Sequence, residues 1–301
     1  MQKLVLATLL AVVSVSAHAV DVKGGSSNDA KVDARASDTI PFGSGKAGIS
    51  IDKSNSINLA DGPFYHIKKK FNNTPINTSA NQNVNGALNP TYLTLKDVNK
   101  VIGFFYNPTL GQVWYEKRAN NTEVISVRQI AEPTIPAAPK FGGLVVAKVP
   151  NAEVYFGEWA PRAANPSTGS NTNLGMNNAE HTVFFVGENP TGNTTGLATA
   201  KYAVLGVNQH TPGQNDFFTG ELTANFGSGD LTGTLSRGAE VINFAGTKIE
   251  NSDGTFVKKI NEKEMEVSGR FYGAQAAALA GYTTRGTSDR RDDVAFGGAK
   301  K

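Results

Sequence analysis

The sequence contains no cysteine. This absence excludes disulfide bonds, metal sites built on thiolates and a cysteine nucleophile, so packing alone must hold the fold together. It also bears on anchoring, because a bacterial lipoprotein carries its lipid on a cysteine directly after the signal peptide. We therefore expect a protein that is not membrane-anchored.

The first 19 residues have the pattern of a secretory signal peptide. Lys3 precedes an apolar run over residues 4–15, and Ala17-His18-Ala19 places small residues where a signal peptidase cleaves. The run is too short for a permanent transmembrane helix. We predict cleavage after Ala19 and secretion through the periplasm to the cell exterior.

The charge balance points to no particular partner. The chain has 29 Lys and Arg against 26 Asp and Glu, and removal of the signal peptide takes away one Lys, leaving 28 − 26 = +2. A nucleic-acid site needs clustered basic residues, and the only dense run, Lys68–Lys70, is typical of a solvated face. We expect no nucleic-acid partner.

Composition and turn spacing predict an all-β fold, because the chain has 32 Gly and few stretches with helical periodicity. Residues 20–40 are small and polar, which predicts a flexible arm. An N-terminal β handle domain is expected over residues 41–140, with a hairpin of Gly103–Tyr106 and Val113–Glu116. The predicted strands are Gly48–Ile51, Gly62–Phe71, Tyr92–Leu95, Val101–Tyr106, Val113–Lys117 and Val124–Ile130.

Three prolines spaced three apart in Glu132–Pro139 predict a stiff, extended connector between two domains. Beyond it, residues 141–301 are expected to form an eight-stranded antiparallel β-barrel. A short helix over 274–280, rich in Ala and ended by Gly281, should precede the last strand. The predicted barrel strands are Ala152–Trp159, His181–Val186, Lys201–Val207, Phe217–Asn225, Asp230–Leu235, Val241–Ile249, Glu264–Tyr272 and Asp292–Gly297.

Four runs carry a resemblance to a known family: Ala152–Trp159, Phe226–Leu235, Gly269–Gly281 and Val294–Lys301. In this order and spacing they resemble the β-barrel of transferrin-binding protein B and factor H-binding protein. A chain with such a barrel, a signal peptide and no lipidated cysteine is similar to the hemophilin group of secreted hemophores. The resemblance implies export by the Slam outer-membrane translocator, non-covalent binding of b-type haem, capture of haem from host haemoglobin, and delivery to a TonB-dependent outer-membrane receptor.

No catalytic constellation is present in the sequence. It lacks a G-x-S-x-G elbow, an H-E-x-x-H motif and a P-loop. After signal cleavage only His66, His181 and His210 remain, far apart in the chain. Triads assemble from distant residues, so an enzyme is unsupported rather than excluded, and a buried histidine–carboxylate pair would favour one. We expect binding, not catalysis.

Haem binding needs an axial ligand, an apolar slot and cations near the propionates. If residues 62–71 form a strand, Phe64, His66, Lys68 and Lys70 share one face, with Tyr65 on the other. Phe105 and Trp114 of the predicted hairpin would supply a wall of the slot. The residues alone favour an ordinary core hairpin with a solvated strand face. With the resemblance, His66 is the favoured iron ligand.

His181 and His210 are the less favoured ligands. The loops that carry them open at the same end of an up-and-down barrel, although two unrelated surface histidines are the simpler interpretation. The long loop Ala160–Glu180 is typical of functional segments, and we hypothesise that it contacts a host protein. The alternative function is a haem-independent binder of a host serum protein, or a host-colonisation factor, on the same barrel.

Overall fold

The fold is described from a computed structural model of the chain, which covers residues 20–38, 45–76, 91–98, 104, 106–130, 141–163, 171–261, 265–285 and 289–301. The predicted signal peptide 1–19 and connector Glu132–Pro139 lie outside these residues. Strands dominate the described chain and helices are short, so the all-β class is confirmed. Among the described residues, every helix is too short or too polar to span a lipid bilayer.

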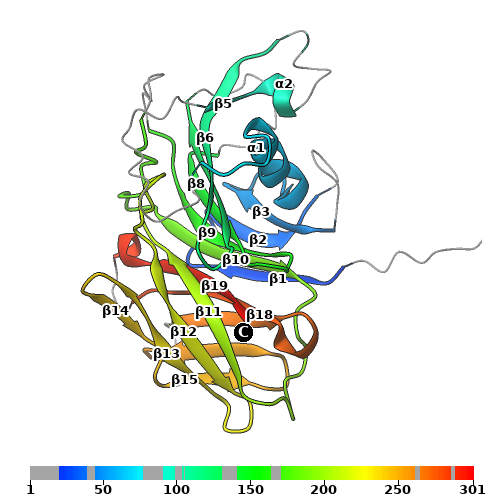
Figure 1. The fold of residues 1–301 in the computed structure, drawn as a ribbon, viewed down its shortest axis with the longest axis vertical. Coiled ribbons are helices and arrows are strands. Elements are labelled where there is room, and N and C mark those ends of the chain that lie inside the picture. Colours follow the sequence, from blue (N-terminus) through cyan, green and yellow to red (C-terminus); the bar gives the residue numbers. More distant parts are fainter. Residues whose placement is uncertain are drawn as a thin grey trace, which may run out of the picture.

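The N-terminal part is built on a seven-stranded antiparallel sheet in the order β1-β10-β9-β8-β7-β6-β5. A smaller sheet of β2, β3 and β4 and the helices α1 and α2 accompany it (Figure 1). The elements are β1 (Val22–Ser26), β2 (Val32–Ala36), β3 (Ala47–Ile51), β4 (Ile57–Asn58), a π-helical turn η1 (Ala60–Phe64), α1 (Tyr65–Lys70), β5 (Thr91–Thr94), α2 (Leu95–Val98), β6 (Thr109–Lys117), β7 (Glu123–Gln129), β8 (Gly143–Lys148), β9 (Val154–Ala160) and β10 (Thr182–Glu188).

The large sheet is buried on both faces. Strand alternation sends Val113 and Tyr115 to the face covered by α1 and the small sheet, where Ile67 joins the same apolar cluster. Trp114, between them, packs on the opposite face with Phe156 of β9. The predicted hairpin partner Gly103–Tyr106 lies partly outside the described residues, and among the described strands β6 pairs with β5 and β7.

The C-terminal part is a closed eight-stranded antiparallel barrel. Its strands follow the order β12-β11-β19-β18-β17-β16-β15-β13, and β12 pairs with β13 to close it. Aromatic rings such as Phe271 and Phe296 fill the interior. The elements are β11 (Ala200–Val207), β12 (Phe218–Asn225), β13 (Asp230–Arg237), β14 (Glu240–Asn243), which pairs only with β13, β15 (Thr247–Glu250), β16 (Thr255–Lys259), β17 (Met265–Tyr272), η2 (Ala274–Ala276), β18 (Ala278–Thr283), η3 (Arg290–Asp292) and β19 (Val294–Lys300).

The barrel has eight strands, as predicted, but two of the predicted barrel strands belong to the first sheet instead. The segments Ala152–Trp159 and His181–Val186 form β9 and β10 of the first sheet. The first barrel strand is therefore β11, which begins at Ala200, and not a strand soon after the predicted start at residue 141. The barrel instead contains β16 and β18, two strands that were not predicted. The helix predicted over 274–280 is a single 3₁₀ turn followed by β18.

The arm predicted over 20–40 is ordered in its described part, because β1 completes the large sheet against β10 and β2 pairs with β3. Hydrogen bonding along the strands outweighs the weak local preference of these small polar residues.

The first sheet packs directly against the barrel, through β9 and β10 on one side and β18 and β19 on the other. Small residues make the close approach possible. A Cβ atom on Gly297 of β19 would lie 2.4 Å from the Phe156 ring, and one on Gly187 of β10 would lie 2.6 Å from the Tyr272 ring. Ala278 and Ala280 lie in the same apolar cluster, which explains why this Ala-rich segment serves as a strand.

Candidate functional site

The segment expected to hold haem is helical. Gly62 and Pro63 lie in η1, which leads into α1, and the lysines that follow favour helix. The predicted line of Phe64, His66, Lys68 and Lys70 along one strand face is therefore wrong. In a helix only residues three or four apart share a side, so His66 is grouped with Lys70.

His66 is half-buried, with neighbours on two sides. Its ring meets the Tyr65 ring edge-on, with centroids 5.1 Å apart, and the backbone of Asp97 in α2 lies near it. Burial lowers the pKa of His66 below its usual 6.5. At neutral pH the imidazole is therefore uncharged, with a proton on one nitrogen and a lone pair on the other.

The two lysines predicted to bind propionates are both paired with carboxylates. Lys68 Nζ lies 2.7 Å from Glu123 Oε1 of β7, and Lys70 Nζ lies 3.0 Å from Asp97 Oδ2. Both salt bridges are partly exposed. Anionic ligand groups would have to compete with these carboxylates for the ammonium groups.

The other predicted haem contacts are distributed over separate places. Phe64 is buried with its ring centroid 5.4 Å from that of Tyr155, whereas Tyr65 is 55% exposed. Trp114 lies on the opposite face of the sheet from α1, so it cannot line a slot at His66. Phe105 lies outside the described residues.

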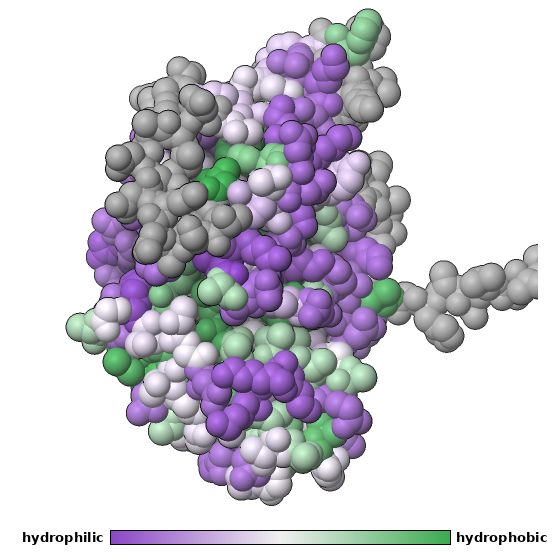
Figure 2. All heavy atoms as spheres, in the orientation of Figure 1, coloured by the Kyte–Doolittle hydropathy of each residue, from purple (hydrophilic) through white to green (hydrophobic). Residues whose placement is uncertain are grey.

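A surface pocket of about 440 Å³ runs along α1, lined by Phe64, Tyr65 and Lys68 together with Tyr155 and Glu123. His66 is not one of its lining residues, so it faces a different side of the helix. Elsewhere on the view in Figure 2, hydrophobic residues reach the surface in small groups between larger hydrophilic areas.

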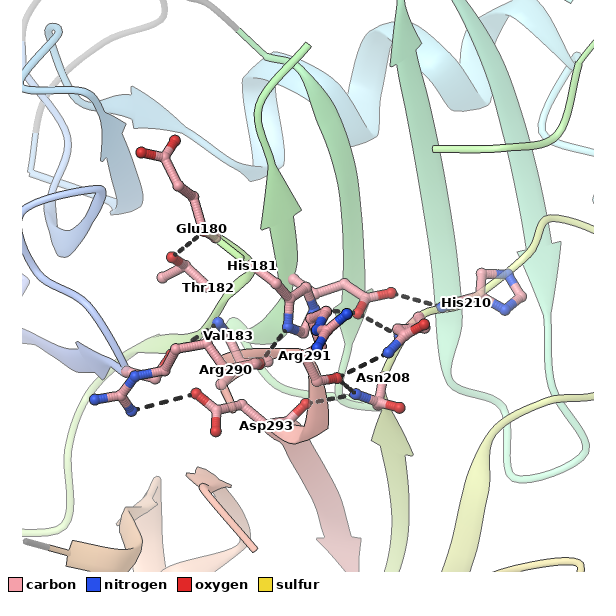
Figure 3. Close-up of polar contacts among 12 residues, drawn as sticks. Glu180, His181, Thr182, Val183, Asn208, His210, Arg290, Arg291 and Asp293 are labelled. Carbon is pink, nitrogen blue, oxygen red and sulfur yellow. Dashed lines mark hydrogen bonds and ion pairs between the residues drawn. The ribbon is translucent and has the colours of Figure 1, made fainter. Parts of the chain in front are cut away.

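His181 and His210 lie buried where the first sheet meets the barrel (Figure 3). The simpler interpretation, that they are two unrelated surface histidines, is therefore wrong. Glu158 of β9 joins them. Its Oε2 accepts hydrogen bonds from His181 Nε2 at 2.7 Å and from the Gln209 backbone at 2.6 Å, and its Oε1 accepts one from the His210 backbone at 2.7 Å. The two histidine loops therefore meet, but the expected reason is wrong, because the His181 loop leads into β10 of the first sheet and not into a barrel strand.

The His210 ring lies between two carboxylates. Nε2 is 2.8 Å from Glu116 Oε2 of β6, and Nδ1 is 2.5 Å from Asp216 Oδ1. The other Glu116 oxygen accepts hydrogen bonds from Arg118 Nη2 and from the Gly213 backbone. Residues 208–216, between β11 and β12, are thus bound to the first sheet by charge-assisted hydrogen bonds.

Both buried histidines are held in the charged form. Burial alone would lower each pKa, but the hydrogen bond to Glu158 and its charge raise that of His181, and Glu116 and Asp216 raise that of His210 to about 9. His181 Nδ1 donates to the Arg290 carbonyl at 2.8 Å, so both of its nitrogens are donors too. Neither ring has a lone pair with which to bind iron or to act as a general base.

The same junction contains a buried carboxyl that no sequence pattern indicates. Asp293 is inaccessible to solvent, and burial raises its pKa to about 6. Its backbone carbonyl and that of Arg291 accept hydrogen bonds from Asn208 Nδ2, at 2.8 and 2.7 Å (Figure 3). Glu158 could have been noticed, because it alternates with the apolar Val154 and Phe156 in a strand buried on both faces. Nowhere in the described chain do three histidine or acidic side chains gather in a way that could hold a metal ion.

The His210 cluster predicts a loss of stability at alkaline pH. The pKa of His210 is about 9 in the folded protein against a usual 6.5, so its contribution is complete below pH 6.5 and is lost as the pH rises towards 9. We expect the midpoint of thermal unfolding to fall across this interval. A midpoint that stays constant from pH 6.5 to 9 would contradict the assignment of a charged His210.

The loop Ala160–Glu180 is partly packed against the protein. Leu174 and Met176 are buried in the same cluster as Trp114, and the Asn171 backbone donates to Gln112 Oε1. Residues 164–170 lie outside the described chain. The contact of this loop with a host protein therefore stays a prediction.

Comparison with known proteins bears on the barrel. Residues 192–300 match the family model of the HphA C-terminal domain. The match begins just before β11 and ends with β19, so it covers the whole barrel and none of the strands of the first sheet. The barrel is therefore similar to the C-terminal domain of the hemophilin family.

Several solved structures are also similar. They include a transferrin-binding protein B double mutant from Haemophilus parasuis Hp5, with 17% identity over 63% of this chain and 39% of that one, and a TM-score of 0.36. Isotype 1 transferrin-binding protein B from serogroup B Neisseria meningitidis is 12% identical over 65% of this chain and 59% of its own, with a TM-score of 0.33. The N-lobe of lactoferrin-binding protein B from Moraxella bovis is 15% identical over 67% of this chain and 83% of its own, with a TM-score of 0.31. The chain spans less than two thirds of the length of both transferrin-binding proteins.

Proposed function

We propose that this protein is a secreted hemophore that binds b-type haem through His66. The observation that supports this best is the contrast among the three histidines of the described chain. His181 and His210 use both ring nitrogens as donors to oxygen, whereas His66 is half-buried and its pKa is lowered, so its imidazole is neutral at neutral pH. An iron-binding histidine must be neutral, because a protonated imidazolium has no lone pair for the metal.

The structure fits the axial ligand better than the rest of a haem site. His66 and its neighbour Tyr65 offer a ligand beside an exposed aromatic ring. Bound haem would supply an iron centre that takes the His66 lone pair. Lys70 lies on the same side of α1, where a propionate would have to share its ammonium group with Asp97. Within the proposal, haem comes from host haemoglobin, passes to a TonB-dependent receptor, and the protein leaves the cell through the Slam translocator.

The proposal is tested by the absorbance spectrum of the purified protein titrated with haemin. We expect a saturable Soret band in the wild type and a weaker or shifted band in His66→Ala, because the axial ligand is lost. Lys248→Ala, which removes an exposed lysine of β15 in the barrel, should leave the band unchanged. Absence of saturable binding in the wild type would end the haem proposal, and an unaltered spectrum of His66→Ala would remove His66 from it.

We also propose that the protein works by binding and not by catalysis. Buried histidine–carboxylate pairs do occur, but each oxygen of Glu116 and Glu158 accepts at least one hydrogen bond and both histidines are sealed from solvent. The alternative function, a host serum protein binder without haem, is distinguished by comparing pull-downs from serum and from haemolysate. Recovery of a serum protein together with failure to bind haemin would favour the alternative.

A further inference from the structure

A row of polar side chains crosses one end of the first sheet. Glu123 of β7 lies opposite Lys148 of β8, and Lys148 lies opposite Tyr155 of β9. Directly opposed residues on neighbouring strands project from the same face, and Tyr155 belongs to the apolar cluster that includes Ile67 of α1. The row therefore lies on the face of the sheet that α1 covers.

The carboxylates at this end of the sheet hold two lysines in place. Glu123 accepts hydrogen bonds from Tyr115 Oη at 2.5 Å and from Lys68 Nζ at 2.7 Å. Glu153 repeats the arrangement, with Lys148 Nζ at 2.5 Å and the hydroxyl of the tyrosine in the row as donors. Burial opposes the charge on both carboxylates, but these hydrogen bonds lower the pKa of each below its usual value, so both are ionised at neutral pH.

Each of these lysines also lies over an aromatic ring. Lys68 Nζ lies 5.4 Å from the centroid of the Tyr115 ring, and Lys148 Nζ lies 5.6 Å from that of the Tyr155 ring. Both distances are within the range of cation–π contacts, about 6 Å. The two ammonium groups are therefore fixed in position, and an anion can share them with the glutamates because an ammonium group has three N–H donors.

The pocket of about 440 Å³ along α1 is lined by both lysines and by aromatic rings. Its volume is within the range of small-molecule sites, about 300–1,000 Å³. Phe64 and Tyr155 form part of the lining, and so does Tyr65, which is 55% exposed. Lys69 Nζ lies 5.6 Å from the centroid of the Tyr65 ring, and Lys69 forms no ion pair with any described residue. Its ammonium group is therefore available to an anion in the pocket.

The charged side chains that line the pocket leave an excess of one positive charge. Within the described residues, the lining cations and carboxylates are Lys68, Lys69 and Lys148 against Asp61 and Glu123. A second pocket, of about 420 Å³, shares Glu123 and Lys148 and adds Lys117 and Glu153, so the excess stays at one over the combined surface. Charge complementarity therefore favours a ligand with a single negative charge. A phosphate monoester, which carries about −1.5 to −2 at pH 7, fits this balance less well than a carboxylate.

We propose that the pocket binds a small aromatic monocarboxylate, whose ring lies against Tyr65 and Phe64 and whose carboxylate is bound by the lysines of the lining. Aromatic side chains favour an aromatic ligand, since offset and edge-on ring contacts add to the burial of apolar area. His66 is not one of the lining residues, so this site is separate from the proposed iron ligand and does not depend on haem binding.

Calorimetric titration of the purified protein with 2-naphthoate tests the proposal. We expect saturable binding that weakens as salt is added. Acetate, which lacks the ring, and 2-naphthylmethanol, which lacks the charge, should bind at least about 10-fold more weakly. Absence of saturable 2-naphthoate binding would overturn the proposal, as would equal binding of 2-naphthylmethanol. Tighter binding of 2-naphthyl phosphate would overturn the assignment of a monocarboxylate.

Two substitutions in the lining should change the 2-naphthoate affinity in opposite directions. Lys69→Met removes a cation and should lower the affinity about 2- to 5-fold, the effect of one exposed charge. Asp61→Asn removes a negative charge and should raise the affinity by a similar factor, while its amide oxygen can still accept the hydrogen bond from Asn58. A loss of affinity in both variants, or a change in neither, would contradict the proposal. Lys69→Met decides alone if Asp61→Asn folds poorly.

Lys258→Met, in the barrel, is the matched control for Lys148→Met. Lys258 of β16 pairs with Glu266 at 2.9 Å and its side chain is 25% exposed, close to the 24% of Lys148. Lys148→Met should weaken 2-naphthoate binding, whereas Lys258→Met removes a comparable ion pair and should leave binding unchanged. Equal losses in the two variants would show a response to net charge alone, and the pocket would then not be the binding site.

Discussion

Replacement of Glu116 by glutamine should lower the free energy of unfolding by about 3–5 kcal/mol, the usual cost of removing one partner from a buried charge pair. Glu116 is inaccessible to solvent and serves two cations, His210 and Arg118. A neutral amide leaves the buried guanidinium without its counter-charge and the imidazolium with Asp216 alone. Denaturant unfolding at neutral pH measures the loss as a lower midpoint.

Glu123→Gln is the control for this measurement. Glu123 lies in the neighbouring strand β7 and pairs with a lysine, but it is partly exposed to solvent, where such pairs contribute at most about 1 kcal/mol. Equal losses in the two variants would show that the buried junction is no more important than a surface pair. That result would contradict the assignment of the Glu116 cluster as the link between sheet and barrel.

Gly297→Ala should cost about 1–3 kcal/mol of stability, because the added methyl group overpacks the contact between barrel and sheet. The new Cβ atom would lie 2.4 Å from Phe156, so the ring must move to relieve the steric clash. Gly192→Ala is the matched control, since its Cβ atom would meet nothing within 4 Å. Urea unfolding of both variants gives the comparison.

The same contact offers a rescue. Combining Gly297→Ala with Phe156→Leu removes part of the ring that the methyl group meets, so the double variant should be more stable than the sum of the two single losses predicts. Strict additivity would show that the two residues do not pack against each other.

Local patterns in the sequence predicted much of the strand content. The alternation of Val154, Phe156 and Glu158 against Tyr155 and Trp159 is observed, since the two sets lie in or beside different buried clusters. The pattern could not tell which sheet the strand joins, because a strand buried on both faces has the same sequence character in a barrel wall as in a packed sheet.

The site shows where sequence reasoning ends. His66 was selected for its aromatic and basic neighbours, but a strand was predicted where Ile67 and Phe64 anchor a helix, so the grouping of its partners was wrong. The burial of His181 and His210 depends on Glu116, Glu158 and Asp216, which are separated from them by up to 94 residues along the chain. Such pairings arise only when the sheet and the barrel pack together.

Both halves of the protein are completed by strands that are far apart in the sequence. Strand β1, near residue 22, pairs with β10 near residue 188, and β19, at residues 294–300, fills the place between β11 and β18. Neither the sheet nor the barrel can close until distant segments are present together, and such long-range pairings fold slowly. A chain emerging from the ribosome therefore carries open strand edges until β19 appears. Truncation of the last strand would leave a species that is exposed to aggregation and proteolysis rather than a slightly smaller barrel.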